Sequence, residues 1–340
     1  MPVLIDAKMK DLISLFDLLN IPSVQSASKA LFTALPIESN SNYRVAKDPD
    51  GAPAILISIS GEYNNNRPHP ISIEHLIVQH DVECRISQPD SKTEDGRFTL
   101  IRCIGVDRSL HVYFLRVVNS LMVMLGSSPS QQEVTSSVNK LVELFRVMAE
   151  PSRKSIQGLW AELLVIVRSQ DSAILVDAWH TLPSDLYDFS MNNQRIEVKS
   201  VIGRVRQHHF SLQQVSPPHD TNVLVASILV ERAGGGLSIT DLADKVRSRL
   251  LNKPDLLFKI DHVIGLSLGE NWRAAIEDRF DWELGIESLS FFDISTIPAF
   301  RTGTPPGVTN VTFVSNLSQT PSINISTYSE NGYLFKALLG

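Results

Sequence analysis

Residues 223–230 read VLVASILV, a nearly continuous apolar run of strand length. Such a run is typical of a strand buried on both faces of a sheet. Apolar residues recur at helical spacing over residues 156–167 before this run and over residues 239–250 after it. We therefore predict an α/β (α+β) fold for this part of the chain, with a central mixed β-sheet flanked by helices.

The first hundred residues carry a different pattern. Apolar side chains alternate along 80–87 and 98–104, and residues 43–47 and 54–60 flank Asp48-Pro-Asp-Gly51, a strong turn signal. Helical spacing returns over 109–126 and 131–149, and an earlier helix is predicted over 8–20. The predicted domains are a β-rich N-terminal domain with flanking helices at 1–127, a linking helix at 128–151, an α/β core at 152–296, and a C-terminal tail at 297–340.

Inside the core, the sequence predicts a short apolar strand at 173–179 and a strand at 208–210 that runs into a helix capped by Ser211. Gly234-Gly-Gly236 is expected to be a flexible connector, since no Lys-Ser/Thr follows it as in a phosphate-binding loop. Short strands are predicted at 311–314 and 323–325.

Composition limits the location and the partners of the protein. The formal charge of the 340 residues is −6, so the chain as a whole repels polyanions and nucleic acid must be met by a local basic patch or a metal. Cys84 and Cys103 lie on strands that could pair, but two reduced thiols are the favoured interpretation. The N-terminal segment does not fit a signal peptide, because acidic residues interrupt it. The apolar segment at residues 110–125 is too short to span a bilayer. We expect a cytoplasmic protein.

Residues 186–202 are predicted to form a hairpin around Asn192-Asn193, because Asn tolerates the positive φ that tight turns need. Pairing outward from this turn places Asp188 opposite Glu197, and the two-residue strand period brings Lys199 to the same face. Directly opposed carboxylates destabilise a sheet unless a cation lies between them.

The chemistry that these side chains predict is metal-assisted hydrolysis. Asp188 and Glu197 are expected to bind Mg²⁺ or Mn²⁺, with the backbone carbonyl of Val198 as a further ligand. Lys199 is expected to orient the attacking water and offset charge in the transition state. Glu162 lies in a helix that is apolar almost all round, so it needs a cation: a metal, Lys199 or another neighbouring basic residue.

The string Ile196-Glu-Val-Lys-Ser200, with Asp188 nine residues before Glu197, resembles the PD-(D/E)XK nuclease superfamily. With Gly158-Leu-Trp-Ala-Glu-Leu163 it more narrowly resembles an uncharacterised bacterial family encoded near restriction and phage-defence genes. The resemblance implies a restriction-endonuclease-like core, Mg²⁺-dependent hydrolysis of DNA, Glu162 as an extra acid and Gln214 as a polar residue near the lysine. Tyr187 stands where the superfamily has proline, so Asp185 is a competitor for the first acid.

Residues 195–206 form the one clearly positive window, with Arg195, Lys199, Arg204 and Arg206 against Glu197. Arg204, Arg206, His209 and Gln214 are the predicted nucleic-acid contacts. His208 and His209 also invite a catalytic interpretation, but a basic rim is favoured.

The predicted function is an Mg²⁺-dependent endonuclease acting on DNA in a bacterial phage-defence or restriction system. The rivals are a non-catalytic DNA-binding or assembly subunit of the same fold and a nuclease for RNA or branched substrates. Other defence-system proteins and a second copy of the chain are the further partners considered, and no membrane partner is expected.

Overall fold

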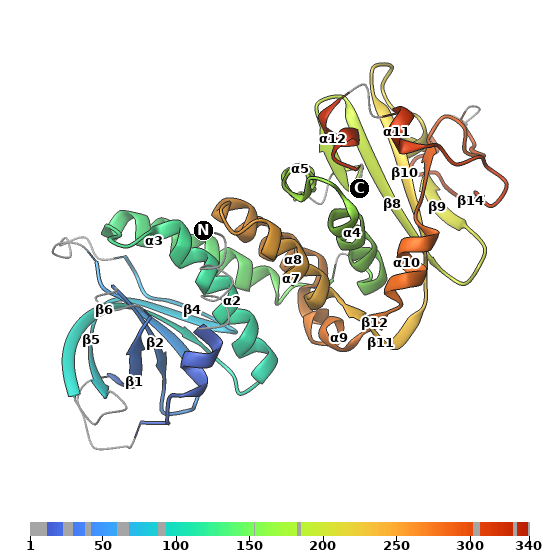
Figure 1. Cartoon of the computed structure of the whole chain (residues 1–340). Coiled ribbons are helices and arrows are strands. Elements are labelled where there is room, and N and C mark those ends of the chain that lie inside the picture. The colour runs from blue at the N-terminus through green and yellow to red at the C-terminus, as the bar shows by residue number, and fades with distance from the viewer. Residues whose placement is uncertain are drawn as a thin grey trace. The chain divides into compact units, whose positions relative to one another are not determined.

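The structure is a computed structural model, and it describes residues 12–22, 30–37, 42–59, 68–87, 93–152, 154–181, 185–301, 307–328 and 332–338. The chain divides into two compact units (Figure 1). Unit 1 comprises Met1–Glu150 and Leu251–Asp261, and unit 2 comprises Pro151–Leu250 and His262–Gly340, so the division falls within helix α8 (Pro254–Leu268). Of the predicted helix at 8–20, residues 12–17 are helical and residues 8–11 lie outside the described part.

Unit 1 is built on a closed sheet. Strand β1 pairs with β2 antiparallel and with β5 parallel, so the order β1-β2-β3-β6-β5 returns to its start and forms a barrel, with β4 added at β5. The strands are β1 (Ala30–Pro36), β2 (Tyr43–Lys47), β3 (Pro53–Ile57), β4 (Ile71–Ile73), β5 (Leu76–Ser87) and β6 (Thr93–Cys103).

The barrel encloses a small apolar core, and two helices follow it. Phe32, Leu56, Phe98 and Leu100 fill this core together with alanines and Cys84. Cys84 and Cys103 are both buried and free, as expected. The predicted helices are α2 (Arg108–Leu125), which packs on β3, and α3 (Gln131–Val147), which packs on β4 and β5.

Unit 2 contains the mixed sheet predicted for the core, in the order β13-β10-β8-β7. Strands β8 and β10 are parallel, whereas the outer pairs β7–β8 and β10–β13 are antiparallel. A single-residue bridge adds to each outer strand, Trp179 to Phe189 of β7 and Ile323 to Phe291 of β13. The strands are β7 (Phe189–Met191), β8 (Gln194–Ile202), β10 (Asn222–Val230) and β13 (Ser290–Asp293).

Both faces of this sheet are covered, which explains the apolar run that forms β10. Helix α4 (Ile156–Arg168) packs on β8 and β10, and α10 (Trp282–Ser288) packs on β10. Val223 and Val225 belong to a second cluster with Phe210, Val215 and Leu317. Further helical segments of the unit are α7 (Ile239–Arg249), which packs on α4, the 3-10 turn η1 (Gly269–Asn271) and α9 (Trp272–Glu277).

Two predictions inside the core are wrong. Residues 173–179 do not form a strand: Ser172–Ala178 is helix α5, which begins where the Asp171 carboxylate accepts hydrogen bonds from the backbone N–H groups of Ala173 and Ile174. The triple glycine is not a free connector but part of β11 (Arg232–Ser238), which pairs with β12 (Arg279–Phe280). A Cβ on Gly236 would lie 2.0 Å from the carbonyl oxygen of Phe280, so only glycine fits there.

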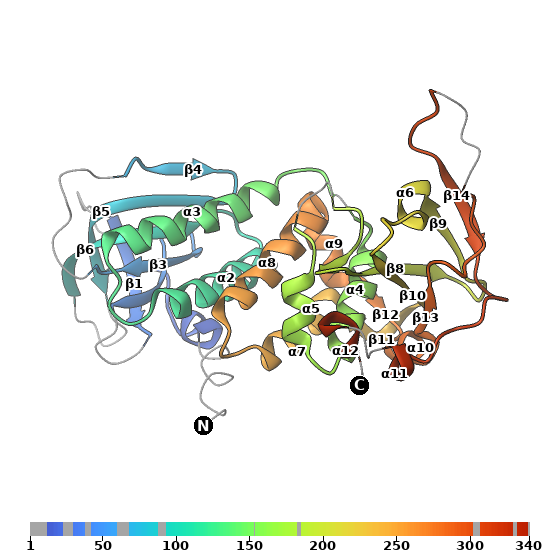
Figure 2. The same cartoon turned by 90° about the horizontal axis from the view of Figure 1, so that it is seen from above.

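The C-terminal segment is part of unit 2 and is seen at its edge in Figure 2. Strand β14 (Thr312–Asn316), predicted at 311–314, pairs antiparallel with β9 (Gln207–Ser211). The strand predicted at 323–325 is wrong: Ile323 forms only a single-residue bridge, and α11 (Ile325–Tyr328) begins two residues later. Helix α12 (Tyr333–Lys336) is attached to β8, because the backbone N–H groups of Leu334 and Phe335 donate hydrogen bonds to Oε1 of Gln194.

The described part of the chain contains no helix whose length and apolar character would let it cross a membrane.

Candidate active site

The hairpin that carries the predicted acids has the predicted register. Phe189 pairs with Ile196 and Met191 with Gln194 across a turn in which Asn192 has φ 51°. Asp188 precedes β7 by one residue, and its Oδ2 accepts a hydrogen bond of 2.8 Å from the backbone N–H of Val198. This bond connects the two strands beyond the end of the ladder and fixes the first acid in place.

The three predicted acids are all buried. Glu162 is 2% exposed, Glu197 5% and Asp188 9%. A buried carboxylate is costly unless it has hydrogen-bond donors or a cation beside it. The neighbours of these acids therefore determine what the site can do.

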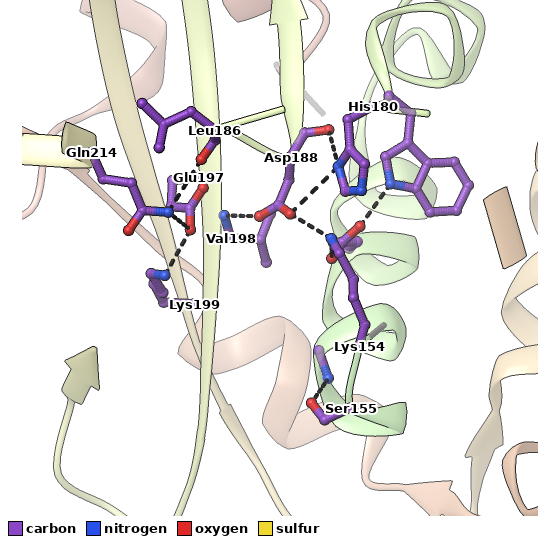
Figure 3. A network of polar contacts seen from close by, with 12 residues as sticks. Lys154, Ser155, His180, Leu186, Asp188, Glu197, Val198, Lys199 and Gln214 are labelled. Atoms are coloured by element: carbon purple, nitrogen blue, oxygen red, sulfur yellow. Dashed lines mark hydrogen bonds and ion pairs between the residues drawn. The ribbon is translucent and has the colours of Figure 1, made fainter. Parts of the chain in front are cut away.

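Asp188 lies between two groups of polar side chains (Figure 3). On the side of α4, Lys154 contributes an Nζ that contacts Oε1 of Glu162 and lies 2.6 Å from Oδ1 of Asp188. The indole Nε1 of Trp179 donates to Oε2 of Glu162 at 2.7 Å, and Nδ1 of His180 lies 3.7 Å from Oδ1 of Asp188. The loop before α4 and the segment after α5 thus converge on two carboxylates, those of Glu162 on α4 and of Asp188.

On the other side, Glu197 is held by Lys199 and Gln214. Its Oε1 lies 2.7 Å from Nζ of Lys199 and accepts a 2.7 Å hydrogen bond from Nε2 of Gln214. The same nitrogen donates to the carbonyl of Leu186 at 3.2 Å, and Lys199 Nζ lies 5.2 Å above the ring of Phe210. Helix α6 (Leu212–Val215) places Gln214 here, because Ser211 and Gln214 form a capping box at its start, where the sequence predicts the cap.

The pKa values of the three acids move in different directions. Burial and then the charge of Asp188 raise the pKa of Glu162 to about 8 and that of Glu197 to about 7, although a lysine lies beside each. Burial also acts to raise the pKa of Asp188, but Lys154 and the N–H of Val198 outweigh it and lower that pKa. Burial opposes the charge of Lys154, yet Glu162 and Asp188 together raise its pKa. Asp188 is therefore the acid that most readily carries a negative charge.

A pocket of about 460 Å³ opens onto this network. Lys154, His180, Asp188, Glu197 and Gln214 line it, and so does Asp185, the competitor of Asp188. Asp188 is the acid that accepts a hydrogen bond from the N–H of Val198 and lies 2.6 Å from Nζ of Lys154.

One set of donor atoms in this network fits a divalent cation. Glu162, His180 and Asp188 each offer a ligand atom, and these atoms lie within 4.8 Å of one another. Carboxylate oxygens suit Mg²⁺ and Mn²⁺, and an imidazole nitrogen suits a transition-metal ion better than Mg²⁺. Glu197 is not in this set and lies on the other side of Asp188. Val198 contacts Asp188 through its backbone N–H, so the role of the Val198 carbonyl as a metal ligand remains a prediction.

The predicted nucleic-acid contacts lie in different environments. Arg204 and His209 are exposed, and Arg204 pairs with Glu231 at 3.1 Å. The guanidinium of Arg206 instead donates to the carbonyl and hydroxyl of Ser227, at 2.7 and 2.8 Å, and to Ser288 and Ser290. Gln214 faces Glu197.

Sequence reasoning missed Lys154 and His180. Lys154 lies just before Ser155, which caps α4, and its backbone N–H donates to the carbonyl of Ser267 at 3.1 Å. The backbone N–H of His180 donates to the carbonyl of Asp188 at 2.9 Å. Neither residue has a fixed spacing to the hairpin, and the one available signal was the need of Glu162 for a basic neighbour.

His208 gives the unit a pH dependence that can be measured apart from catalysis. Its Nε2 lies 2.7 Å from Oγ of the fully buried Ser227, and burial lowers its pKa from 6.5 to about 4. Between these values the unfolded chain binds a proton that the folded chain does not, so stability falls as the pH drops. Between pH 6.5 and pH 5, we expect the wild type to lose about 1.5 kcal/mol of the stability of unit 2, and we expect His208→Gln not to show this loss.

The measurement is urea unfolding followed by tryptophan fluorescence, because all four tryptophans lie in unit 2: Trp160, Trp179, Trp272 and Trp282. Equal pH profiles for wild type and His208→Gln would contradict the assignment.

The mixed sheet with α4 across it, the hairpin acids and the adjoining lysine define a PD-(D/E)XK-type, restriction-endonuclease-like core. The sequence profile of the family described as "Putative PD-(D/E)XK family member (DUF4420)" matches residues 12–318. The chain belongs to this family, which confirms the superfamily and fold class predicted from the hairpin and α4. No curated protein and no solved structure matches it significantly.

Proposed function

We propose that this protein is a divalent-metal-dependent nuclease that hydrolyses phosphodiester bonds of DNA. The observation that carries the proposal is the cluster of acids and lysines around Asp188. Asp188 and Glu197 are buried and line the pocket, Lys199 contacts Glu197, and a third buried acid, Glu162, shares the ammonium group of Lys154 with Asp188. Clustered buried carboxylates are costly to a fold, which favours a functional reason for them. Family membership agrees with nuclease chemistry at this position.

In this proposal Asp188, with Glu162 and His180 on one side and Glu197 on the other, would hold the metal. The metal supplies Lewis-acid polarisation of the phosphate and lowers the pKa of a bound water. Lys199 orients the attacking water and offsets negative charge that develops on the phosphate. Gln214 and Lys199 keep the carboxylate of Glu197 in one orientation through their shared contact with Oε1.

Arg204 and His209 are proposed to contact the phosphate backbone near this pocket, since both are exposed. A role in bacterial phage defence or restriction is part of the proposal and is supported by the family resemblance. A non-catalytic binding subunit is the second candidate. It is favoured by one observation, that lysines already neutralise Glu162, Asp188 and Glu197.

The test is cleavage of plasmid DNA, linear DNA and single-stranded RNA by purified protein with Mg²⁺, Mn²⁺ or EDTA. We expect metal-dependent cleavage of DNA and a loss on the order of 10²- to 10³-fold in Lys199→Met. Lys336→Met is the matched control, because Lys336 is an exposed lysine of the same unit outside the pocket lining.

Two outcomes would decide against the proposal. Folded protein that binds DNA but cleaves nothing would favour the non-catalytic subunit. Preferential cleavage of RNA would keep the site and change the substrate.

A further inference from the structure

The ammonium group of Lys154 is held between two of the acids that the proposed metal needs. Its Nζ contacts Glu162 and lies 2.6 Å from Oδ1 of Asp188 (Figure 3). Glu162 and Asp188 are also two of the three residues whose ligand atoms converge within 4.8 Å. One lysine and one prospective metal site therefore share the same pair of carboxylates.

The backbone around Lys154 is fixed, whereas the side chain has room to leave. Its N–H donates to Ser267, and the next residue caps α4 through a 3.1 Å hydrogen bond from the N–H of Gly158 to Ser155 Oγ. The side chain is 22% exposed and lines the 460 Å³ pocket. A lysine stem has several rotatable bonds, so Nζ can move into the pocket without a backbone change.

An ammonium and a divalent cation cannot occupy this place together. Like charges a few ångströms apart in a partly buried site repel strongly, because screening there is weaker than in water. Binding of a metal to Glu162 and Asp188 thus requires that Lys154 give up both contacts.

We infer that Lys154 is an internal cation that competes with the metal for Glu162 and Asp188 and is displaced when the metal binds. This inference rests on the metal site of the proposed function. Without metal, Lys154 neutralises the two acids and keeps them in position. When the metal binds, the free energy needed to displace the lysine lowers the affinity of the site for the metal. Lys154 therefore sets the metal concentration at which the site fills.

The first test measures Mn²⁺ binding in the absence of DNA, and the free ion is monitored by electron paramagnetic resonance. We expect Lys154→Met to bind Mn²⁺ about tenfold or more tightly than wild type, because the competing charge is gone. Lys154→Arg keeps a cation and is expected to bind no more tightly than wild type, and Lys336→Met is expected to match wild type. A folded Lys154→Met that binds Mn²⁺ equally or more weakly overturns the inference, as does the absence of Mn²⁺ binding in all four proteins.

The second test uses wild-type protein alone and so does not depend on how the variants fold. Lysine amines are acetylated with a water-soluble ester, and the extent at Lys154 is measured by mass spectrometry relative to Lys336. An amine held by two carboxylates in a pocket reacts slowly, so we expect acetylation of Lys154 to rise severalfold when Mn²⁺ is added. An unchanged ratio overturns the inference.

These readouts are separate from cleavage. If Mn²⁺ displaces Lys154 but no nucleic acid is cut, the proposed function fails and the competition stands. If DNA is cut while Lys154 keeps its contacts, the competition fails and the nuclease stands.

Discussion

Asp188→Asn is expected to lower metal-dependent DNA cleavage on the order of 10³-fold while leaving the protein folded. The amide oxygen can still accept from the N–H of Val198, so the connection between the hairpin strands survives. Of the three acids of the site, Asp188 is the one whose pKa is lowered, and it lies between the two groups of polar side chains, so its negative charge is lost where the site depends on it most. The measurement is the initial rate of plasmid nicking at saturating Mg²⁺ and Mn²⁺, with the folded state checked by circular dichroism.

Asp185→Asn is the matched control for this variant. Asp185 lines the same pocket and competes with Asp188 as the first acid of the sequence motif. We expect it to change the rate by no more than a few-fold. Full activity in Asp188→Asn together with its loss in Asp185→Asn would move the first acid to Asp185.

Arg206→Ala is expected to destabilise unit 2 by about 3 kcal/mol, because the network of hydrogen bonds from a half-buried guanidinium is broken and its acceptors lose their donor. The guanidinium donates to Ser227 on β10, Ser288 at the end of α10 and Ser290 on β13. The measurement is urea unfolding followed by tryptophan fluorescence, as for His208. DNA affinity of the remaining folded protein is measured at two salt concentrations.

Arg204→Ala provides the contrast, since Arg204 is exposed and makes one ion pair with the equally exposed Glu231. We expect it to change stability by less than about 0.5 kcal/mol, to weaken DNA binding and to make that binding less dependent on salt. If Arg206→Ala left stability unchanged and weakened only DNA binding, Arg206 would be a nucleic-acid contact as its place in the basic window suggested.

The parts of the site that could be predicted from the sequence are those whose geometry is set by local spacing. A two-residue turn and a strand period of two place Asp188, Glu197 and Lys199 relative to one another without knowledge of the rest of the fold. The capping box of α6 is equally local, and it positions Gln214 so that its side chain donates a hydrogen bond to Glu197.

The parts that could not be predicted depend on contacts between distant segments. Lys154 reaches the hairpin because its loop is bonded to Ser267, more than a hundred residues later in the chain. The opposed acids do not simply face one another: Asp188 bonds with Val198 and Lys154, while Glu197 contacts Lys199 and Gln214. Periodicity could not identify α5 either, since a largely apolar segment of seven residues fits a strand or a helix equally well.

The bridges at the two outer strands of the unit 2 sheet bear on how this protein can associate. Many proteins recruit a peptide or a second copy by strand addition, in which the incoming backbone hydrogen-bonds to a free sheet edge. Here Trp179 already contacts β7, and Ile323 already contacts β13. Natural sheets cover their edges in this way and so avoid edge-to-edge aggregation. A partner of this unit is therefore expected to recognise side-chain surfaces, whose specificity can change from one relative to another without altering the sheet beneath the acids.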